Sequence, residues 1–245
     1  MPGNIGGDLQ SLRELYESRW AQYGRTPLSL GWTKGKQDIR FSMLLDGLSV
    51  EGSRFLDIGC GFGDINQVLK TRAQQYTYLG VDLVPTFVKE ATESYGSSST
   101  KFAVCDFYSE SLQWEGEYVV ASGIFGFQMH EIDNYNYIKT MLEKMLAVAS
   151  EAVAVDFLSD RVNFRRENTF YADPCRVLEI ALSLTRCVKV RHDYMPFEFA
   201  LTLFKDDSFS DSDTVFSRYK RYARQDNRLH QEKPRFDHRG GGLSE

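Results

Sequence analysis

The stretch that decides the fold of this 245-residue chain reads Phe55-Leu56-Asp57-Ile58-Gly59-Cys60-Gly61-Phe62-Gly63-Asp64. An apolar run ends near an acid, and glycines follow at every second position before a segment with helical periodicity. Glycines at such a strand-to-helix turn allow a sharp turn, close approach of the backbone to a ligand, and tight helix packing. Loops that bind a dinucleotide pyrophosphate are spaced differently, as G-x-G-x-x-G. An acid at position 57 would repel a pyrophosphate, so the stretch favours a cationic ligand of the amino-acid kind.

Two further apolar runs also end in an acid. Residues 78–81 are followed by Asp82, and residues 102–105 are followed by Asp106 and Phe107. Carboxylates accept hydrogen bonds. Asp82 is therefore suited to both hydroxyls of a ribose, and Asp106 to an adenine amino group, with Phe107 beside the ring. Each acid has an ordinary alternative as a capping or strand-terminal residue. The three together indicate a nucleoside-binding site.

Short apolar runs alternate with helical periodicity from residue 53 onward, which indicates an α/β fold built from βαβ units around a parallel sheet. We expect strands at 54–58, 76–81, 101–105, 118–122, 152–157, 188–192 and 198–204, with helices at 64–72, 85–95, 134–148 and after Pro174. Only residues 193–197 separate the last two strands. That connection is too short for a helical crossover, so these strands should pair as an antiparallel hairpin.

The chain is expected to have three parts. Residues 1–50 hold two helix candidates, 8–23 and 36–46, which we interpret as an N-terminal helical cap over a core of residues 51–205. Residues 206–245 form a polar extension, with a helix over 212–224 followed by a flexible tail. Basic residues predominate only within residues 218–239, which hold eight of them against three acids. They are typical of a solvated helix followed by disorder, and the alternative is a surface for an acidic partner.

The run Leu56-Asp57-Ile58-Gly59-Cys60-Gly61-x-Gly63 resembles the signature loop of class I S-adenosylmethionine-dependent methyltransferases. Asp82 and Asp106 match the ribose-binding and adenine-binding acids of that family. The resemblance covers roughly residues 52–204. It implies a Rossmann-like, seven-stranded, mostly parallel sheet of order 3-2-1-4-5-7-6, with strand 7 antiparallel and an N-terminal cap closing over the cofactor.

The resemblance also implies a cofactor, S-adenosyl-L-methionine, which leaves as S-adenosyl-L-homocysteine. Gln37 and Arg40 are candidates for holding its methionine carboxylate; the alternative is two polar residues on an exposed helix face. The full set of expected cofactor-binding residues is Gln37, Arg40, Asp57, Gly59, Cys60, Gly61, Gly63, Asp82, Leu83, Asp106, Phe107 and Ser122.

The acceptor site should lie beyond the fourth strand, under the N-terminal cap. His130 is the candidate general base, because it follows that strand and histidine titrates near neutrality; a solvent-facing capping histidine is the alternative. Aromatic side chains are candidates for contacting the acceptor, although Tyr16 and Trp20 at helical spacing also suit a core. These candidates are Tyr16, Trp20, Trp32, Tyr171 and Tyr194.

The chemistry expected is methyl transfer to a small molecule. Residues 121–131 depart from the Asn/Asp-Pro-Pro-Tyr/Phe motif of methyltransferases that act on base amino groups or glutamine amides. No set of acids for a magnesium site is evident, so we expect the reaction to be independent of a metal ion. We also expect the methyl group to go to oxygen. N- or C-methylation, a non-catalytic cofactor-binding regulator, and aminopropyl transfer are the alternatives.

The composition limits the classes of partner that we expect this chain to bind. The 29 basic and 34 acidic residues leave a net charge of −5, whereas nucleic-acid enzymes need a positive field to displace counterions from phosphates. No apolar run approaches the ~20 residues that cross a bilayer. The first residues lack the features of a signal peptide, and the four cysteines have no zinc-ligand spacing. We therefore expect a cytoplasmic protein without nucleic-acid or membrane partners, with a homodimer among the open oligomeric states.

Overall fold

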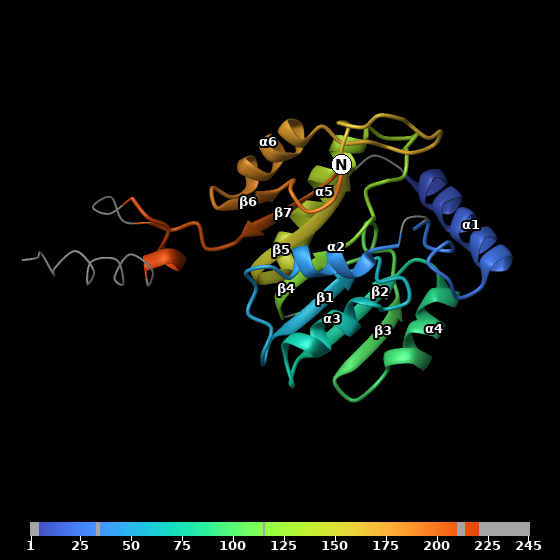
Figure 1. The fold of residues 1–245 in the computed structure, drawn as a ribbon, viewed down its shortest axis with the longest axis horizontal. Helices are drawn as coiled ribbons and strands as arrows, with labels where there is room; N and C mark the ends of the chain where they lie inside the picture. Colours follow the sequence, from blue (N-terminus) through green and yellow to red (C-terminus); the bar gives the residue numbers. More distant parts are fainter. Residues whose placement is uncertain (1–4, 33–34, 115, 210–213, 221–245) are drawn as a thin grey trace, which may run out of the picture. The chain divides into compact units, whose positions relative to one another are not determined.

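The computed structural model describes residues 5–32, 35–114, 116–209 and 214–220, and groups the chain into two units, residues 1–205 and 206–245. The first unit contains a seven-stranded sheet of order β3-β2-β1-β4-β5-β7-β6 (Figure 1). Its strands are β1 (Arg54–Ile58), β2 (Thr77–Asp82), β3 (Thr100–Val104), β4 (Gly116–Ala121), β5 (Ala149–Leu158), β6 (Val188–Arg191) and β7 (Glu198–Phe204).

The strand directions agree with the order. β1 to β5 are parallel, and β7 runs antiparallel to both β5 and β6. The predicted order and the reversed seventh strand are therefore confirmed. β1 is buried along all but its first residue and β7 along its whole length. Near-continuous burial is what strands with helices on both faces require.

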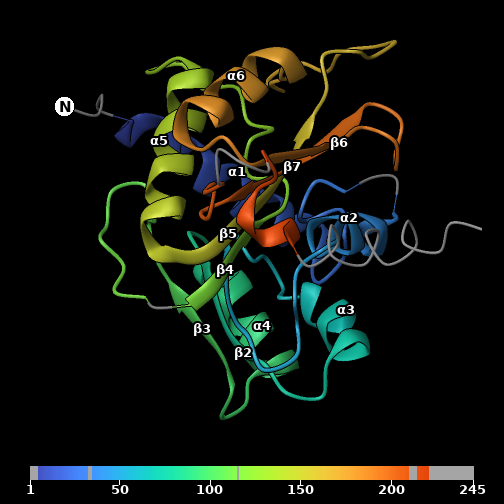
Figure 2. The same ribbon diagram turned by 90° about the vertical axis from the view of Figure 1, so that its left-hand side faces the viewer.

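Helices cover both faces of this sheet. α5 (Asn134–Val148) and α6 (Pro174–Leu184) pack together on one face, whereas α2 (Gln37–Leu44) and α3 (Ile65–Arg72) pack together on the other (Figure 2). α4 (Pro85–Tyr95) packs on β2 and β3. Fully buried side chains from the central strands and from α5 make the main core, among them Leu56, Val119, Val153, Ile138 and Leu142.

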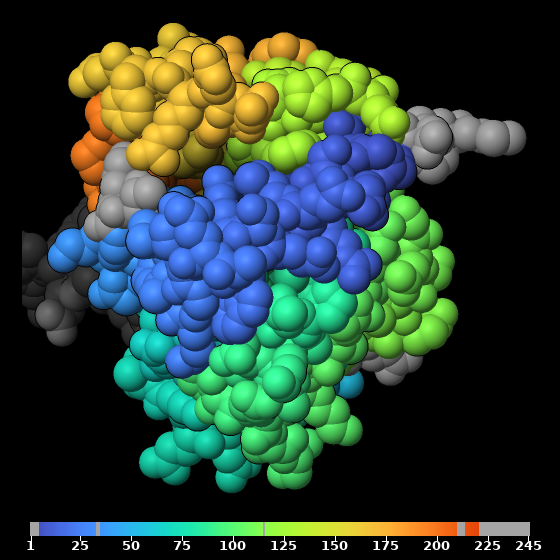
Figure 3. Space-filling view, turned by 90° about the vertical axis from the view of Figure 1, so that its right-hand side faces the viewer, coloured from blue at the N-terminus to red at the C-terminus, as the bar shows by residue number. Residues whose placement is uncertain are grey.

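The N-terminal helix α1 (Gly6–Tyr23) lies across the carboxyl ends of the strands rather than against a sheet face. Figure 3 shows the N-terminal residues, in blue, covering this side of the molecule between yellow and light-green residues above and teal and green residues below. Both carboxylate oxygens of the buried Asp8 accept the backbone N–H of His130, and Oδ2 also accepts that of Glu131. Glu131 in turn accepts the N–H of Gly7. The cap is thus tied to the loop that follows β4.

The second unit is described only in part. Of the helix expected over residues 212–224, the structure describes residues 214–220, and these do not form the continuous helix that was predicted. Within 214–220 the chain forms a single 3-10 turn, Ser217–Tyr219, beside a short bridge between Phe209 and Phe216. Among the helices that the structure describes, none is long and apolar enough to cross a membrane.

Candidate functional site

A pocket lies at the carboxyl ends of β1, β2 and β4, beneath α1. Ten of the twelve residues predicted to contact the cofactor line this first pocket. They are Gln37, Asp57, Gly59, Cys60, Gly61, Asp82, Leu83, Asp106, Phe107 and Ser122. The parallel strands explain the convergence, because their carboxyl ends meet at one edge of the sheet.

The glycine-rich loop is held against the end of β2. The backbone N–H groups of Gly59 and Cys60 both donate to the carbonyl of Val81, and the N–H of Gly61 donates to Asp82 Oδ2 at 2.8 Å. Gly59 and Gly61 have φ of +69° and +53°. Only glycine adopts such angles without steric cost, so the loop can turn sharply beside the pocket. Gly63 lies within the turn but not in the pocket lining.

Asp57 and Asp82 are buried acids in this lining. Asp57 accepts the hydroxyl of Tyr78 at 2.7 Å, and Asp82 also accepts the N–H of Val84 at 2.9 Å. Burial raises the pKa of Asp57 to about 7 and that of Asp82 to about 6. Both carboxylates would therefore gain from a cationic ligand or from hydroxyl donors. A sulfonium amino acid joined to a ribose supplies both.

Asp106 and Phe107 complete the far end of the first pocket. Asp106 Oδ1 accepts the backbone N–H of Tyr108 and Ser109, both at 3.1 Å, so the turn after β3 fixes this carboxylate. Phe107 is buried with its ring in the lining. This pair could hold an adenine by a hydrogen bond at its edge and an apolar contact at its face.

A second pocket adjoins the first. The two share Tyr16, Leu30, Trp32, Gly123 and Phe127 as walls. Gly123 has φ of +77°, and a Cβ added there would lie 2.7 Å from the Trp32 ring. The ring therefore packs directly on the Gly123 backbone. The two pockets therefore adjoin each other along these shared residues.

The floor of the second pocket is charged. Arg40, which is 4% exposed, donates to both carboxylate oxygens of Glu198 through Nε and Nη2, and its Cζ lies 3.6 Å from the centroid of the Trp32 ring. Arg40 therefore does not line the first pocket, where it was expected to hold the methionine carboxylate. Its guanidinium lines the second pocket, held by Glu198, because α2 packs on β5 and β7.

Asp156 also lines the second pocket and was missed by sequence reasoning. The sheet pairs Ala121 with Val155, so Ser122 and Asp156 come together one residue further along. Asp156 accepts the hydroxyl of Ser122 at 2.6 Å and the N–H of Gly123 at 2.7 Å. Burial raises its pKa to about 6, against the lowering effect of Arg40. An acid in an otherwise apolar run was the available signal, within β5 for Asp156 and at the start of β7 for Glu198.

The structure does not place His130 at either pocket. Its side chain is exposed, its ring meets the edge of Phe127, and its backbone N–H binds Asp8. It is therefore not positioned to take a proton from a ligand in these pockets, which corrects the general-base hypothesis. The reason is that the chain leaves the pocket after Phe127 to meet α1.

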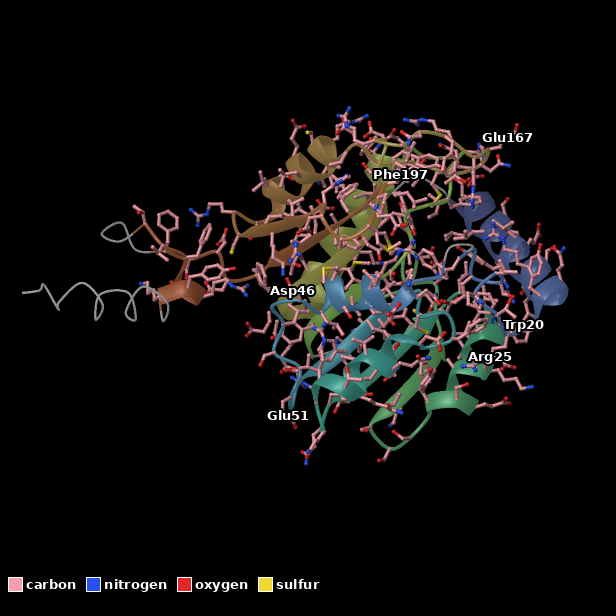
Figure 4. The ribbon with its side chains drawn as sticks, in the orientation of Figure 1. Trp20, Arg25, Asp46, Glu51, Glu167 and Phe197 are labelled. Carbon is pink, nitrogen blue, oxygen red and sulfur yellow. The ribbon has the colours of Figure 1, made fainter. Side chains whose placement is uncertain are left out.

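Some of the aromatic residues expected to contact the acceptor line a pocket, and others do not. Tyr16 and Trp32 line both pockets, and Tyr171 lines the second. Trp20 instead packs its ring on Phe62 and Phe87, with centroids 5.7 and 6.2 Å away. Figure 4 shows it well separated from Phe197 and Glu167, two residues of the second pocket. The expected acceptor contact of Trp20 is therefore replaced by a core contact.

Tyr194 lines neither pocket. Its hydroxyl is buried without a hydrogen-bond partner among the described residues, and burial together with the charges of Asp156 and Glu198 raises its pKa. The structure therefore does not place Tyr194 at the acceptor rim. Within the described ranges, no group of three or more His, Cys, Asp or Glu side chains is arranged to hold a metal ion.

Comparisons with known proteins agree with this geometry. A methyltransferase domain model matches residues 55–152. The chain is 26% identical over 154 residues to a Mycobacterium tuberculosis protein named "Putative methyltransferase Rv1506c", a match that covers 61% of this chain and 91% of that protein.

Solved structures with the same fold include methyltransferases crystallised with the cofactor or its product. Magnesium protoporphyrin IX methyltransferase from Synechocystis PCC 6803, with S-adenosylhomocysteine bound, superposes with a TM-score of 0.59 at 14% identity, over 80% of this chain and 98% of that one. N-methyltransferase NodS from Bradyrhizobium japonicum gives 0.54 at 15% identity, over 80% and 97%. Its methyltransferase domain match and its sheet order make the chain similar to class I S-adenosylmethionine-dependent methyltransferases.

Proposed function

We propose that this methyltransferase transfers the methyl group of S-adenosylmethionine to an oxygen atom of a small molecule bound in the second pocket, without help from a metal ion. The observation that carries the proposal is that the two pockets adjoin, with five residues lining both. The similar folds include one protein named for a magnesium porphyrin and another named an N-methyltransferase. The fold therefore does not identify the acceptor, whereas the lining of the second pocket limits its chemistry.

The chain's own residues suit each part of the cofactor. We assign Asp82 to the ribose hydroxyls and Asp106, with Phe107, to the adenine. The methionine portion would lie along the glycine-rich loop beside Asp57, with Gln37 of α2 nearby in the lining. The positive charge of the sulfonium is compatible with this surrounding, because Asp57 and Asp82 are the acidic side chains buried deepest in it.

The second pocket suits a small planar acceptor. Aromatic side chains make up much of its wall, namely Tyr16, Trp32, Phe127, Phe157, Phe164, Tyr171 and Phe197. Aromatic rings bury large apolar areas and stack on flat ligands. Tyr16 and Trp32 belong to both pockets, so an acceptor stacked there would lie beside the cofactor.

The transfer itself needs alignment more than activation. Bound S-adenosylmethionine supplies a methyl group on a sulfonium, whose leaving group is neutral. The protein's contribution is to hold the acceptor in line with that methyl and to exclude water. Tyr16 of α1, Trp32 and Gly123 line both pockets, so they bound the junction between them. An oxygen nucleophile also has to lose a proton.

The cofactor assignment is tested by Asp82→Asn. We expect the Kd for S-adenosylmethionine to rise about 5- to 150-fold, equivalent to about 1–3 kcal/mol, because the variant loses charge-assisted hydrogen bonds to the ribose. Isothermal titration calorimetry gives the Kd. Asp38→Asn, an exposed change on α2, is the matched control and should bind like wild type. An unchanged Kd for Asp82→Asn would refute the ribose assignment.

The reaction is tested with methyl-labelled cofactor and pools of hydroxyl, amine and carbon acceptors. We expect label in ether or ester products. Label only in amine or carbon products would contradict O-methylation. Label that never leaves the cofactor would favour a binding protein, and a larger thermal shift with decarboxylated cofactor would favour aminopropyl transfer.

A further inference from the structure

The floor of the second pocket combines a hydrogen-bond donor without an acceptor and a carboxylate. Arg40 donates hydrogen bonds to Glu198 through Nε and Nη2, whereas its Nη1 is buried and has no hydrogen-bond partner among the described residues. A buried donor left unpaired is costly, and a ligand oxygen would satisfy it. Asp156 lines the same pocket, and the charge of Arg40 acts on it.

The charge of this floor argues against an anionic acceptor. One guanidinium faces two carboxylates, Asp156 and Glu198, so the buried floor carries an excess of negative charge at neutral pH. A carboxylate or phosphate placed there would meet this charge in a poorly solvated environment. The rim carries Arg19, Arg166 and Glu167, where solvent and salt weaken their effect.

A neutral hydroxyl satisfies both groups. Its oxygen accepts from Arg40, and its O–H donates to Asp156. We propose that Asp156 is the general base of this methyltransferase, and that the second pocket takes a planar aromatic acceptor whose neutral hydroxyl lies between Arg40 and Asp156. The inference rests on the proposed O-methylation and names its acceptor class and its proton acceptor.

The step balances without another reactant. A lone pair of the hydroxyl oxygen forms the new C–O bond, and the electrons of the C–S bond go to sulfur, which leaves as a neutral thioether. The hydroxyl proton passes to the Asp156 carboxylate and from there to solvent.

The surroundings of Asp156 suit this role. Ser122 and Gly123 hold its two oxygens in place from the end of β4, Arg40 faces it from α2, and Glu198 and Tyr194 from β7 and the turn before it. Asp57 of β1 also acts on it electrostatically. Because burial raises its pKa to about 6, Asp156 is mostly ionised at neutral pH yet holds a proton more strongly than an ordinary carboxylate. Both properties favour a general base.

Binding tests the acceptor class without turnover. Protein loaded with S-adenosylhomocysteine is titrated with 2-naphthol and with 2-naphthoate, which match in ring system but differ in charge. We expect wild type to bind 2-naphthol more tightly than 2-naphthoate, and Asp156→Asn to reduce or reverse that preference. Glu151→Gln, at the exposed start of the same strand, should keep it. Wild type that prefers 2-naphthoate, or that binds no 2-naphthol up to its solubility limit, would overturn the acceptor class.

Steady-state kinetics test the proposal that Asp156 is the general base. With a hydroxyl acceptor, kcat/KM of wild type should rise with pH through about 6, the value for Asp156, and level off. Asp156→Asn should lose this rise and about 10²- to 10⁴-fold of kcat, while its Kd for S-adenosylhomocysteine stays within a few-fold. An Asp156→Asn variant that folds, binds cofactor and keeps its kcat would contradict the role of Asp156 alone. Wild type that fails to bind the cofactor or transfer its methyl would instead contradict the proposed function.

Discussion

Single residues in the glycine-rich loop carry two separate constraints, one on the backbone and one on space. Gly63 has φ of +75°, and a Cβ added there would lie 2.7 Å from Phe102 Cε1. Gly52, before β1, has nearly the same φ, +74°, but an added Cβ would meet nothing within 4 Å. The two positions therefore separate the cost of the angle from the cost of the contact.

We predict that Gly52→Ala lowers the free energy of unfolding by about 1–2 kcal/mol, the cost of a left-handed backbone for a residue with Cβ. Gly63→Ala should cost this amount and about 1–3 kcal/mol more, because Phe102 must shift within a packed core. Urea denaturation of both variants measures the difference. Equal losses would show that the contact with Phe102 relaxes freely.

At the scale of elements, the attachment of α1 links the cap to the rest of the domain. Asp8, at the start of the helix, holds the N–H groups of His130 and Glu131, although about 120 residues separate these positions along the chain. Leu9, Leu12 and Tyr16 of the same helix line the first pocket. The apolar side chains of α1 therefore line this pocket and also pack on the core.

We predict that Asp8→Ala loosens α1, because two backbone donors lose their acceptor. Amide hydrogen exchange over residues 6–23 should become faster, and the Kd for S-adenosylmethionine should rise by several-fold, up to about 1–2 kcal/mol in binding free energy. Glu14→Ala, on the exposed side of α1, is the control. Unchanged exchange in Asp8→Ala would contradict an anchoring role.

At the scale of the whole molecule, buried acids gather where β1, β2 and β5 end. Burial raises the pKa of Asp57 to about 7, and those of Asp82 and Asp156 to about 6. An acid whose pKa is higher in the folded than in the unfolded protein binds its proton more tightly when folded. Its contribution to stability is greatest when it is protonated, and declines as pH rises from the unfolded value to the folded one.

We predict that the cofactor-free protein loses stability from these acids between about pH 4 and pH 7. Asp57→Asn should reduce this loss by about 1–3 kcal/mol, because one of the titrating groups is gone. Urea denaturation across this pH range gives the slope, and Asp38→Asn should leave it unchanged. S-adenosylmethionine favours the ionised acids, so its binding should tighten as pH rises over the same range. A slope identical in wild type and Asp57→Asn would contradict the shifted pKa.

The sequence by itself determined most of the acids and glycines that line the first pocket. The φ preferences of Gly59 and Gly61, the acids that follow β2 and β3, and the short connection before β7 are local features. Each depends on residues close together in the chain, so each could be read as a pattern. Because the strands are parallel, local features at their ends converge in space, and most of the predicted cofactor residues do line one pocket.

Only the tertiary structure decided the acceptor side. Arg40 meets Glu198 across 158 positions, and Asp156 meets Ser122 across 34. These pairings depend on where α2 packs and on the register between β4 and β5, neither of which a single-sequence pattern encodes. His130 and Trp20 were misplaced for the same reason. A residue's neighbours across the sheet determine whether it faces a pocket, the core or solvent, because burial and charge depend on what packs against it.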